Sequence, residues 1–197
     1  MGEKYLFQPL TRDDKISVVL YRVGIALSTV IISIAAYLSF SQNIKLHSLE
    51  INILLTSLYI SVGLSVFFIH LYVSKFKRAL KKLYFISILA LITLFVMGRG
   101  DVSGILINKP YGPFLLIPLS GCLGFITAKE AFCFKLMEGY LLALIMPFYL
   151  FLLSAGDMTF RGTSYGLTLI AVMLIFFTFR KVFMPMHYDI GDKSAYS

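Results

Sequence analysis

The chain has 197 residues, of which 58% are hydrophobic and only 14% are Asp, Glu, Lys or Arg, where an average soluble domain carries about 25% charged residues. Its mean hydropathy is +0.84, and so short a chain cannot bury that much apolar surface in a water-soluble core. These values exclude a soluble enzyme, a nucleic-acid-binding domain and a disordered tail, and they predict a protein that crosses a membrane several times.

Six apolar runs approach the length of about 20 residues that a helix needs to cross a bilayer. The third and fourth runs are short, and the first begins directly after Arg22. The runs cover residues 23–40, 51–73, 83–97, 114–128, 139–155 and 163–179. The sequence therefore predicts an all-α bundle of about six transmembrane helices over residues 23–179. An N-terminal segment, residues 1–22, and a C-terminal tail, residues 180–197, flank it.

The formal charge of +8 is distributed unevenly between the predicted loops. Fourteen of the 18 Lys and Arg residues lie on the side that carries both termini, and the opposite side has only Lys45, Arg99, Lys109 and Arg161. Basic residues accumulate in cytoplasmic loops, where they also meet anionic lipid head groups. We therefore expect both termini and both segments that flank the bundle to be cytoplasmic.

Two predicted helices carry small residues at every fourth position. Helices in lipid associate through close backbone approach and side-chain hydrogen bonds, so these stripes predict packing faces. A water-accessible lining for a solute path is the alternative. We expect the second and fourth helices to pack directly against each other through them. The stripes are Ser57, Ser61 and Ser65 in the second helix and Ser120, Gly124 and Ala128 in the fourth. The sixth helix is dominated by large apolar residues such as Leu174–Phe177 and is predicted to face lipid.

The densest chemistry lies at the junction of the fourth and fifth helices, residues 129–138. If this segment is helical, Glu130 and Cys133 share one face, and the charge of Lys129 could favour a thiolate. We expect Glu130 to pair with Arg78 of the second-to-third loop, as a structural clamp. A docking or redox site at Cys133 and a plain solvated helix end are the alternatives.

The sequence contains few other residues with catalytic or ligating potential. His70 is the one histidine within a predicted span, and an interfacial hydrogen-bonded role is expected for it. Haem between helices would need two facing histidines, and catalytic zinc three ligands. Motifs of zinc proteases, serine hydrolases and phosphate-binding loops are absent. The sequence therefore predicts no cofactor, no metal site and no enzymatic activity.

Several strings resemble an uncharacterised family of integral membrane proteins, a domain of unknown function of cyanobacteria and photosynthetic eukaryotes. The similarity extends from about Tyr21 to Ser194, and its strings are residues 21–24, 69–72 ahead of Lys77 and Arg78, 130–134 and 189–194. The resemblance implies a multi-pass protein of a thylakoid or plasma membrane, and no activity.

Three functions remain open. The first is a non-enzymatic accessory or assembly factor of a larger membrane complex. The second is a transporter or channel for a small solute, although no predicted span has an ionisable residue at its centre, as coupled transport usually requires. The third and weakest is a pigment- or quinone-binding protein.

Overall fold

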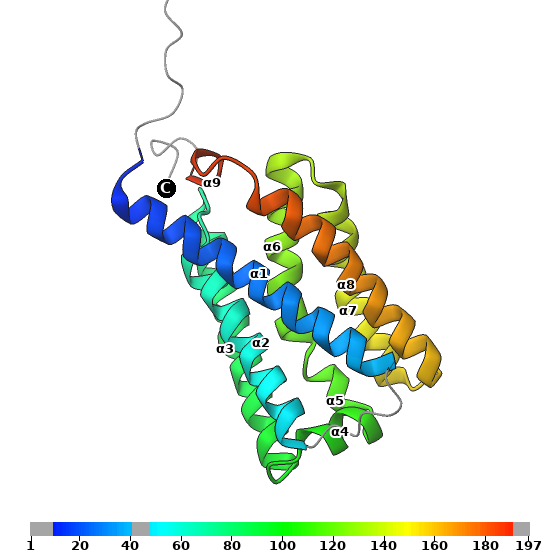
Figure 1. Cartoon of the computed structure of the whole chain (residues 1–197). Helices are drawn as coiled ribbons and strands as arrows, with labels where there is room; N and C mark the ends of the chain where they lie inside the picture. Colours follow the sequence, from blue (N-terminus) through cyan, green and yellow to red (C-terminus); the bar gives the residue numbers. More distant parts are fainter. Residues whose placement is uncertain (1–9, 41–47, 191–197) are drawn as a thin grey trace, which may run out of the picture.

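The computed structural model describes residues 10–40 and 48–190, without the side chains of residues 107 and 108. Every element in this part of the chain is a helix (Figure 1). Six are long and apolar enough to cross a membrane: α1 (Arg12–Phe40), α2 (Ser48–Phe68), α3 (Ser74–Met97), α6 (Ile117–Phe134), α7 (Met137–Ala155) and α8 (Phe160–Val182). Three are short: α4 (Val102–Asn108), α5 (Tyr111–Phe114) and α9 (His187–Ile190). The predicted all-α membrane bundle is therefore confirmed.

The spans differ from their predicted bounds mainly at α1 and α3. Helix α1 begins at Arg12 because a reciprocal cap fixes it there: Thr11 N–H donates to Asp14 Oδ2 (2.8 Å), and Asp14 N–H donates to Thr11 Oγ1 (3.3 Å). Helix α3 begins at Ser74 and includes the four lysines of residues 75–82. Lysine is a good helix former, and its long side chain can hold the charge in water while its stem covers apolar surface, so these residues extend the helix beyond the apolar run. The longer α1 places Arg22 inside a helix instead of at its end.

The spans pack as an antiparallel bundle. Helix α1 packs on α2 and α8, α6 packs on α7 and α3, and α7 also contacts α8. The start of α1, the α2–α3 and α6–α7 connections and α9 lie at one end (Figure 1). We call this the basic end, because 12 of the described Lys and Arg residues lie in these segments or in the ends of α3, α6 and α8 that adjoin them. Helices α4 and α5 and the α7–α8 turn lie at the opposite end. Three residues used for the charge count, Lys4, Lys45 and Lys193, lie outside the described residues.

The small residues of α2 pack against α1 instead of α6. A Cβ added to Gly24 of α1 would lie 2.3 Å from Ser65 Oγ and 2.6 Å from the carbonyl oxygen of Ser61. The two helices are also linked by Ser28 Oγ, 2.8 Å from Ser61 Oγ, and by Ser65 Oγ, which donates to the carbonyl of Tyr21 (3.1 Å). The stripe is thus a packing face, but its partner is a glycine of the first helix.

The small-residue stripe of α6 contacts α7 at Gly124. A Cβ on Gly124 would lie 3.3 Å from Ala143 Cα, on α7. Ser57, Ser120 and Ala128 are only half-buried. The expected direct contact of the two stripes is therefore wrong, because each faces the helix next to it in the chain.

Helix α8 is not simply a lipid-facing helix. Leu174 and Phe177 are fully buried, whereas Ile175 and Phe176 are exposed. The helix packs on α1 and α7 along one side and presents the other side outward. Its apolar residues look alike in the sequence, and only the packing separates them.

Candidate functional site

A cluster of charged side chains is buried at the basic end, and Glu130 of α6 is its centre. Glu130 has no exposed surface. Its Oε1 accepts a hydrogen bond from Tyr21 OH of α1 (2.6 Å) and one from Lys129 Nζ (2.7 Å), and its Oε2 forms an ion pair with Lys181 of α8. One carboxylate therefore joins three transmembrane helices.

Lys181 connects Glu130 to a second carboxylate. It is fully buried, forms an ion pair with Asp189 of α9, and its Nζ lies 4.3 Å from the ring centroid of Phe134. Asp189 in turn accepts a hydrogen bond from Arg22 Nε (2.7 Å). The ammonium of Lys181 thus has a carboxylate on two sides and an aromatic face on a third, which compensates for the water it has lost.

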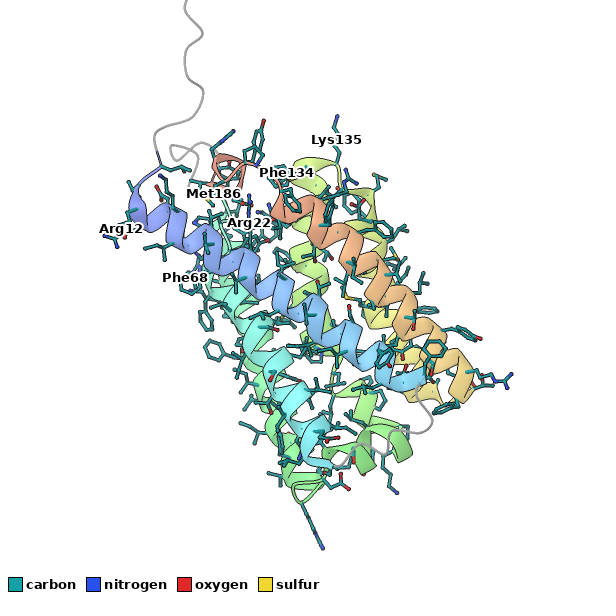
Figure 2. All side chains as sticks on the ribbon, in the orientation of Figure 1. Arg12, Arg22, Phe68, Phe134, Lys135 and Met186 are labelled. Carbon is teal, nitrogen blue, oxygen red and sulfur yellow. The ribbon has the colours of Figure 1, made fainter. Side chains whose placement is uncertain are left out.

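Arg22 of α1 also holds the end of α8. One guanidinium nitrogen donates to the carbonyls of Val182 (2.9 Å) and Met184 (2.6 Å), and the other to that of Pro185 (3.2 Å). The last carbonyls of a helix have no partner within it, so a planar fork of donors suits this position. Figure 2 labels Arg22, Phe134 and Met186 at the same end of the bundle.

The cluster carries one excess positive charge. Arg22, Lys129 and Lys181 contact Glu130 and Asp189. All of these residues are buried except Lys129, whose side chain is 12% exposed. Removing charges from water costs several kcal/mol each, and this cost is recovered only where each charge has close partners. The cluster can therefore act as a clamp between α1, α6, α8 and α9.

His70 lies beside the cluster, just after the end of α2. Its Nε2 is 3.2 Å from Ser17 Oγ of α1. Burial lowers the pKa of His70, and the charges of Lys129 and Lys77 lower it further, whereas Asp189 and Asp14 act in the opposite direction. The interfacial hydrogen bond expected for His70 is thus present in the structure, and the neutral imidazole is favoured.

The structure separates two predicted site residues from Glu130. Arg78 is exposed on α3, so the expected Glu130–Arg78 pair is wrong, and Lys129 and Lys181 take its place. Cys133 is exposed, although it follows Glu130 by three residues. Helix α6 ends one residue later, because Lys135 adopts a left-handed conformation (φ 54°). The carboxylate thus faces the bundle interior while the thiol faces outward.

Four members of the cluster were not predicted as site residues. Tyr21, Arg22 and Asp189 belong to the strings that carry the family resemblance, and Lys181 lies next to the exposed Arg180. A basic residue at the edge of an apolar run usually marks the end of a membrane span, so the positions of Arg22 and Lys181 do not by themselves predict buried charges. The available signal concerned Arg22 alone, which has an apolar residue on each side, whereas Lys181 directly follows Arg180. Within residues 10–40 and 48–190, no group of three His, Cys, Asp or Glu residues is placed to hold a metal.

A family model described as "Uncharacterized integral membrane protein (DUF2301)" matches residues 64–197. This range contains His70, Glu130, Lys181 and Asp189, while Tyr21 and Arg22 precede it. Comparison with curated proteins and with solved structures gives no match. The chain belongs to this family of uncharacterised integral membrane proteins.

Proposed function

We propose that this chain is a non-enzymatic accessory or assembly factor that binds other proteins within a thylakoid or plasma membrane. The observation that carries the proposal is the clamp: its charged groups are buried and engaged with one another, as in a structural support. A bundle that presents apolar helix faces to the bilayer is suited to binding other membrane proteins. Helices α7 and α3 are the least buried of the six spans, so they offer the largest apolar faces.

The proposal includes an orientation. The basic end faces the cytoplasm, or the stroma in a plastid, because loops rich in Lys and Arg stay on that side. The clamp then lies at the cytoplasmic boundary, and both chain termini are cytoplasmic. The family resemblance favours the membranes of an oxygenic phototroph.

The test is isolation of the tagged chain from its native membrane in a gentle detergent. The expected result is migration with a defined larger complex, whose subunits are identified by mass spectrometry. The same preparation in a harsh detergent is the control, and it should release the chain alone. Migration of the chain by itself in every gentle detergent would contradict the proposal.

A transporter is the second candidate, and one observation favours it. Glu130 and Lys181 are fully buried within α6 and α8, and ionisable residues inside membrane helices often mark ion or proton paths. Solute flux in proteoliposomes that contain the purified chain, lost in Glu130→Gln, would support this candidate. A solute flux no greater than that of empty liposomes would contradict the transporter and favour the accessory role.

A further inference from the structure

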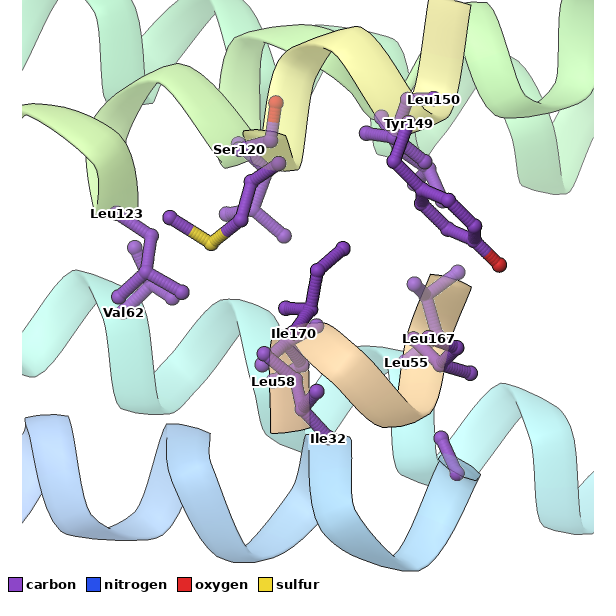
Figure 3. A pocket seen from close by; sticks show the side chains of 14 residues that line it. Ile32, Leu55, Leu58, Val62, Ser120, Leu123, Tyr149, Leu150, Leu167 and Ile170 are labelled. Carbon is purple, nitrogen blue, oxygen red and sulfur yellow. The ribbon is translucent and has the colours of Figure 1, made fainter. Parts of the chain in front are cut away.

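A cavity lies inside the bundle, away from the charge cluster. Its inner chamber has a volume of about 170 Å³ and is lined by residues of α1, α2, α6, α7 and α8 (Figure 3). A second chamber of about 360 Å³ shares many of the same lining residues, among them Ile32, Leu58 and Leu150, and extends toward Leu106 of α4 and Pro113 of α5. The two chambers therefore adjoin each other, and together they extend toward the opposite end of the molecule.

The lining of this cavity is almost entirely hydrocarbon. Its three hydroxyl groups each donate to a backbone carbonyl: Ser120 to Ile117 (2.8 Å), Tyr149 to Thr163 (3.0 Å) and Ser39 to Ala36 (2.7 Å). Figure 3 shows the Ser120 oxygen directed away from the chamber. A guest with polar groups would lose its hydrogen bonds to water without replacement, so the cavity selects an apolar group.

The cavity is elongated along the helices. Its lining on α2 extends from Val62 to Ile51, which corresponds to about 16 Å at the rise of an α-helix. This length suits a hydrocarbon tail that lies parallel to the lipid tails around the bundle. A compact ring would occupy only part of it.

The inner end of the cavity is closed before the charge cluster. On α8, Leu174 and Phe177 lie between the cavity residue Ile170 and Lys181, and both are fully buried. On α6, Ile126 has the same position between Leu123 and Glu130 and is also fully buried. A guest that enters from the opposite end therefore meets packed side chains and cannot pass toward the basic end.

We propose that this cavity holds the hydrocarbon tail of a membrane lipid, either an acyl or a prenyl chain, with the head group outside the cavity. Apolar cavities of this size stay dry and bind apolar molecules, and helices in a bilayer gain little from closing such a space, because lipid is as apolar as their own side chains. The bilayer supplies tails at high concentration. The inference rests on the cavity alone and does not depend on the accessory role.

The test uses two photoactivatable probes in vesicles that contain the full chain. One is a phosphatidylcholine with a diazirine on its acyl chain, and the other is a prenyl alcohol with a diazirine near its tail end. Peptide mapping should show labelled lining residues such as Met146 and Leu150, besides lipid-exposed residues such as Leu144. Labelling of the lining by one probe alone identifies an acyl or a prenyl tail, and labelling by both supports the tail class.

A filled variant makes the test specific. Ala35 lines both chambers, so Ala35→Trp should reduce labelling of the lining at least fivefold while labelling of Leu144 is unchanged. Ala35→Leu is the fallback if the larger variant does not fold, and Leu144→Trp is the matched control. The proposal is overturned if neither probe labels the lining while both label Leu144, or if labelling of the lining survives in the filled variants.

Discussion

Glu130 shows how a single carboxylate can hold several helices. It is fully buried, and its partners come from α1, α6 and α8. A buried charge of this kind contributes little when compared with a well-packed apolar residue, but removal of one partner leaves the others uncompensated. The contribution of Glu130 to stability should therefore appear mainly when a substitution removes one of the charged partners.

We predict that Glu130→Gln lowers the free energy of unfolding by about 3–5 kcal/mol, because the fully buried Lys181 and the partly buried Lys129 then lose their shared anion. Glu138→Gln is the matched control, since it breaks the more exposed pair with Arg180 and should cost about 1 kcal/mol or less. Unfolding in detergent measures both. Equal effects of the two substitutions would contradict the clamp.

The partner of Glu130 can be tested separately. Arg78→Gln should change the stability by less than about 0.5 kcal/mol and should add to Glu130→Gln independently, because Arg78 is exposed on α3. Lys181→Met combined with Glu130→Gln should instead cost less than the sum of the single changes. Strong coupling between Glu130 and Arg78 would restore the pair expected from the sequence.

His70 should make the stability of the protein depend on pH. Burial and the charges of Lys129 and Lys77 lower the pKa of His70 in the folded protein, so the unfolded chain takes up this proton first as the pH falls. The contribution of His70 to stability is therefore complete above its unfolded pKa of about 6.5 and decreases as the pH falls toward the lowered value. His70→Gln should flatten the dependence of the melting temperature on pH in this window. A slope unaffected by His70→Gln would argue against this assignment.

At the level of elements, the bundle is organised by close contacts between helices that are neighbours in the chain. Gly24 brings α1 against α2, and Gly124 brings α6 against α7. The ion pair between Arg22 and Asp189 connects α1 with α9, which lie far apart in the chain. Small residues thus allow the close packing of the helix pairs α1–α2 and α6–α7, and charged residues connect helices of different pairs.

Gly24→Ala should separate α1 from α2, because the added Cβ would lie 2.6 Å from a backbone oxygen of α2. The expected loss is about 1–3 kcal/mol. Gly121→Ala is the control with the same change of helix propensity, and its Cβ would meet only the flexible end of Leu83 at 3.3 Å. Thermal unfolding in detergent compares the two, and equal melting temperatures would rule out close packing at Gly24.

Gly124→Leu should also destabilise the protein, but at the α6–α7 contact, since Ala143 is the nearest neighbour of Gly124. A disulfide engineered between α6 and α7 should therefore form less readily in this variant, and one between α1 and α2 should form as before. Loss of the α1–α2 disulfide instead would point to a different arrangement.

In the whole molecule, the charge cluster and the apolar cavity lie at different levels of one bundle. The charge cluster lies at the basic end, and the apolar cavity extends toward the opposite end, with fully buried apolar residues between them. This separation means that a change in the cluster and a change in the cavity can be studied independently.

The orientation of the whole chain can be read from its own cysteines. Cys133 is exposed at the basic end and Cys122 is fully buried, so a membrane-impermeant maleimide should label Cys133 from the cytoplasmic side only. Arg161→Cys in a Cys133→Ser background should be labelled from the other side. Labelling of both positions from one side would disprove the proposed topology.

The sequence by itself determined the fold class, the number of spans and the segregation of basic residues to one end of the bundle. Length and hydropathy decide these features, because a bilayer admits only helices of sufficient apolar length. Glu130, Lys129 and His70 also stood out in the sequence as polar groups at a membrane boundary. Each of these inferences depends on residues within one segment.

Only the tertiary structure decided which partners these residues have. Tyr21, Lys181 and Asp189 lie far from Glu130 in the chain, and nothing in the local pattern distinguishes the buried Lys181 from the exposed Arg180 beside it. The same holds for the small residues of α2. Their partner in the structure is Gly24 of α1, whereas the sequence predicted α6. Charge pairing and cavity formation depend on the rotation of each helix about its axis, and this rotation is set by the packing of the whole bundle.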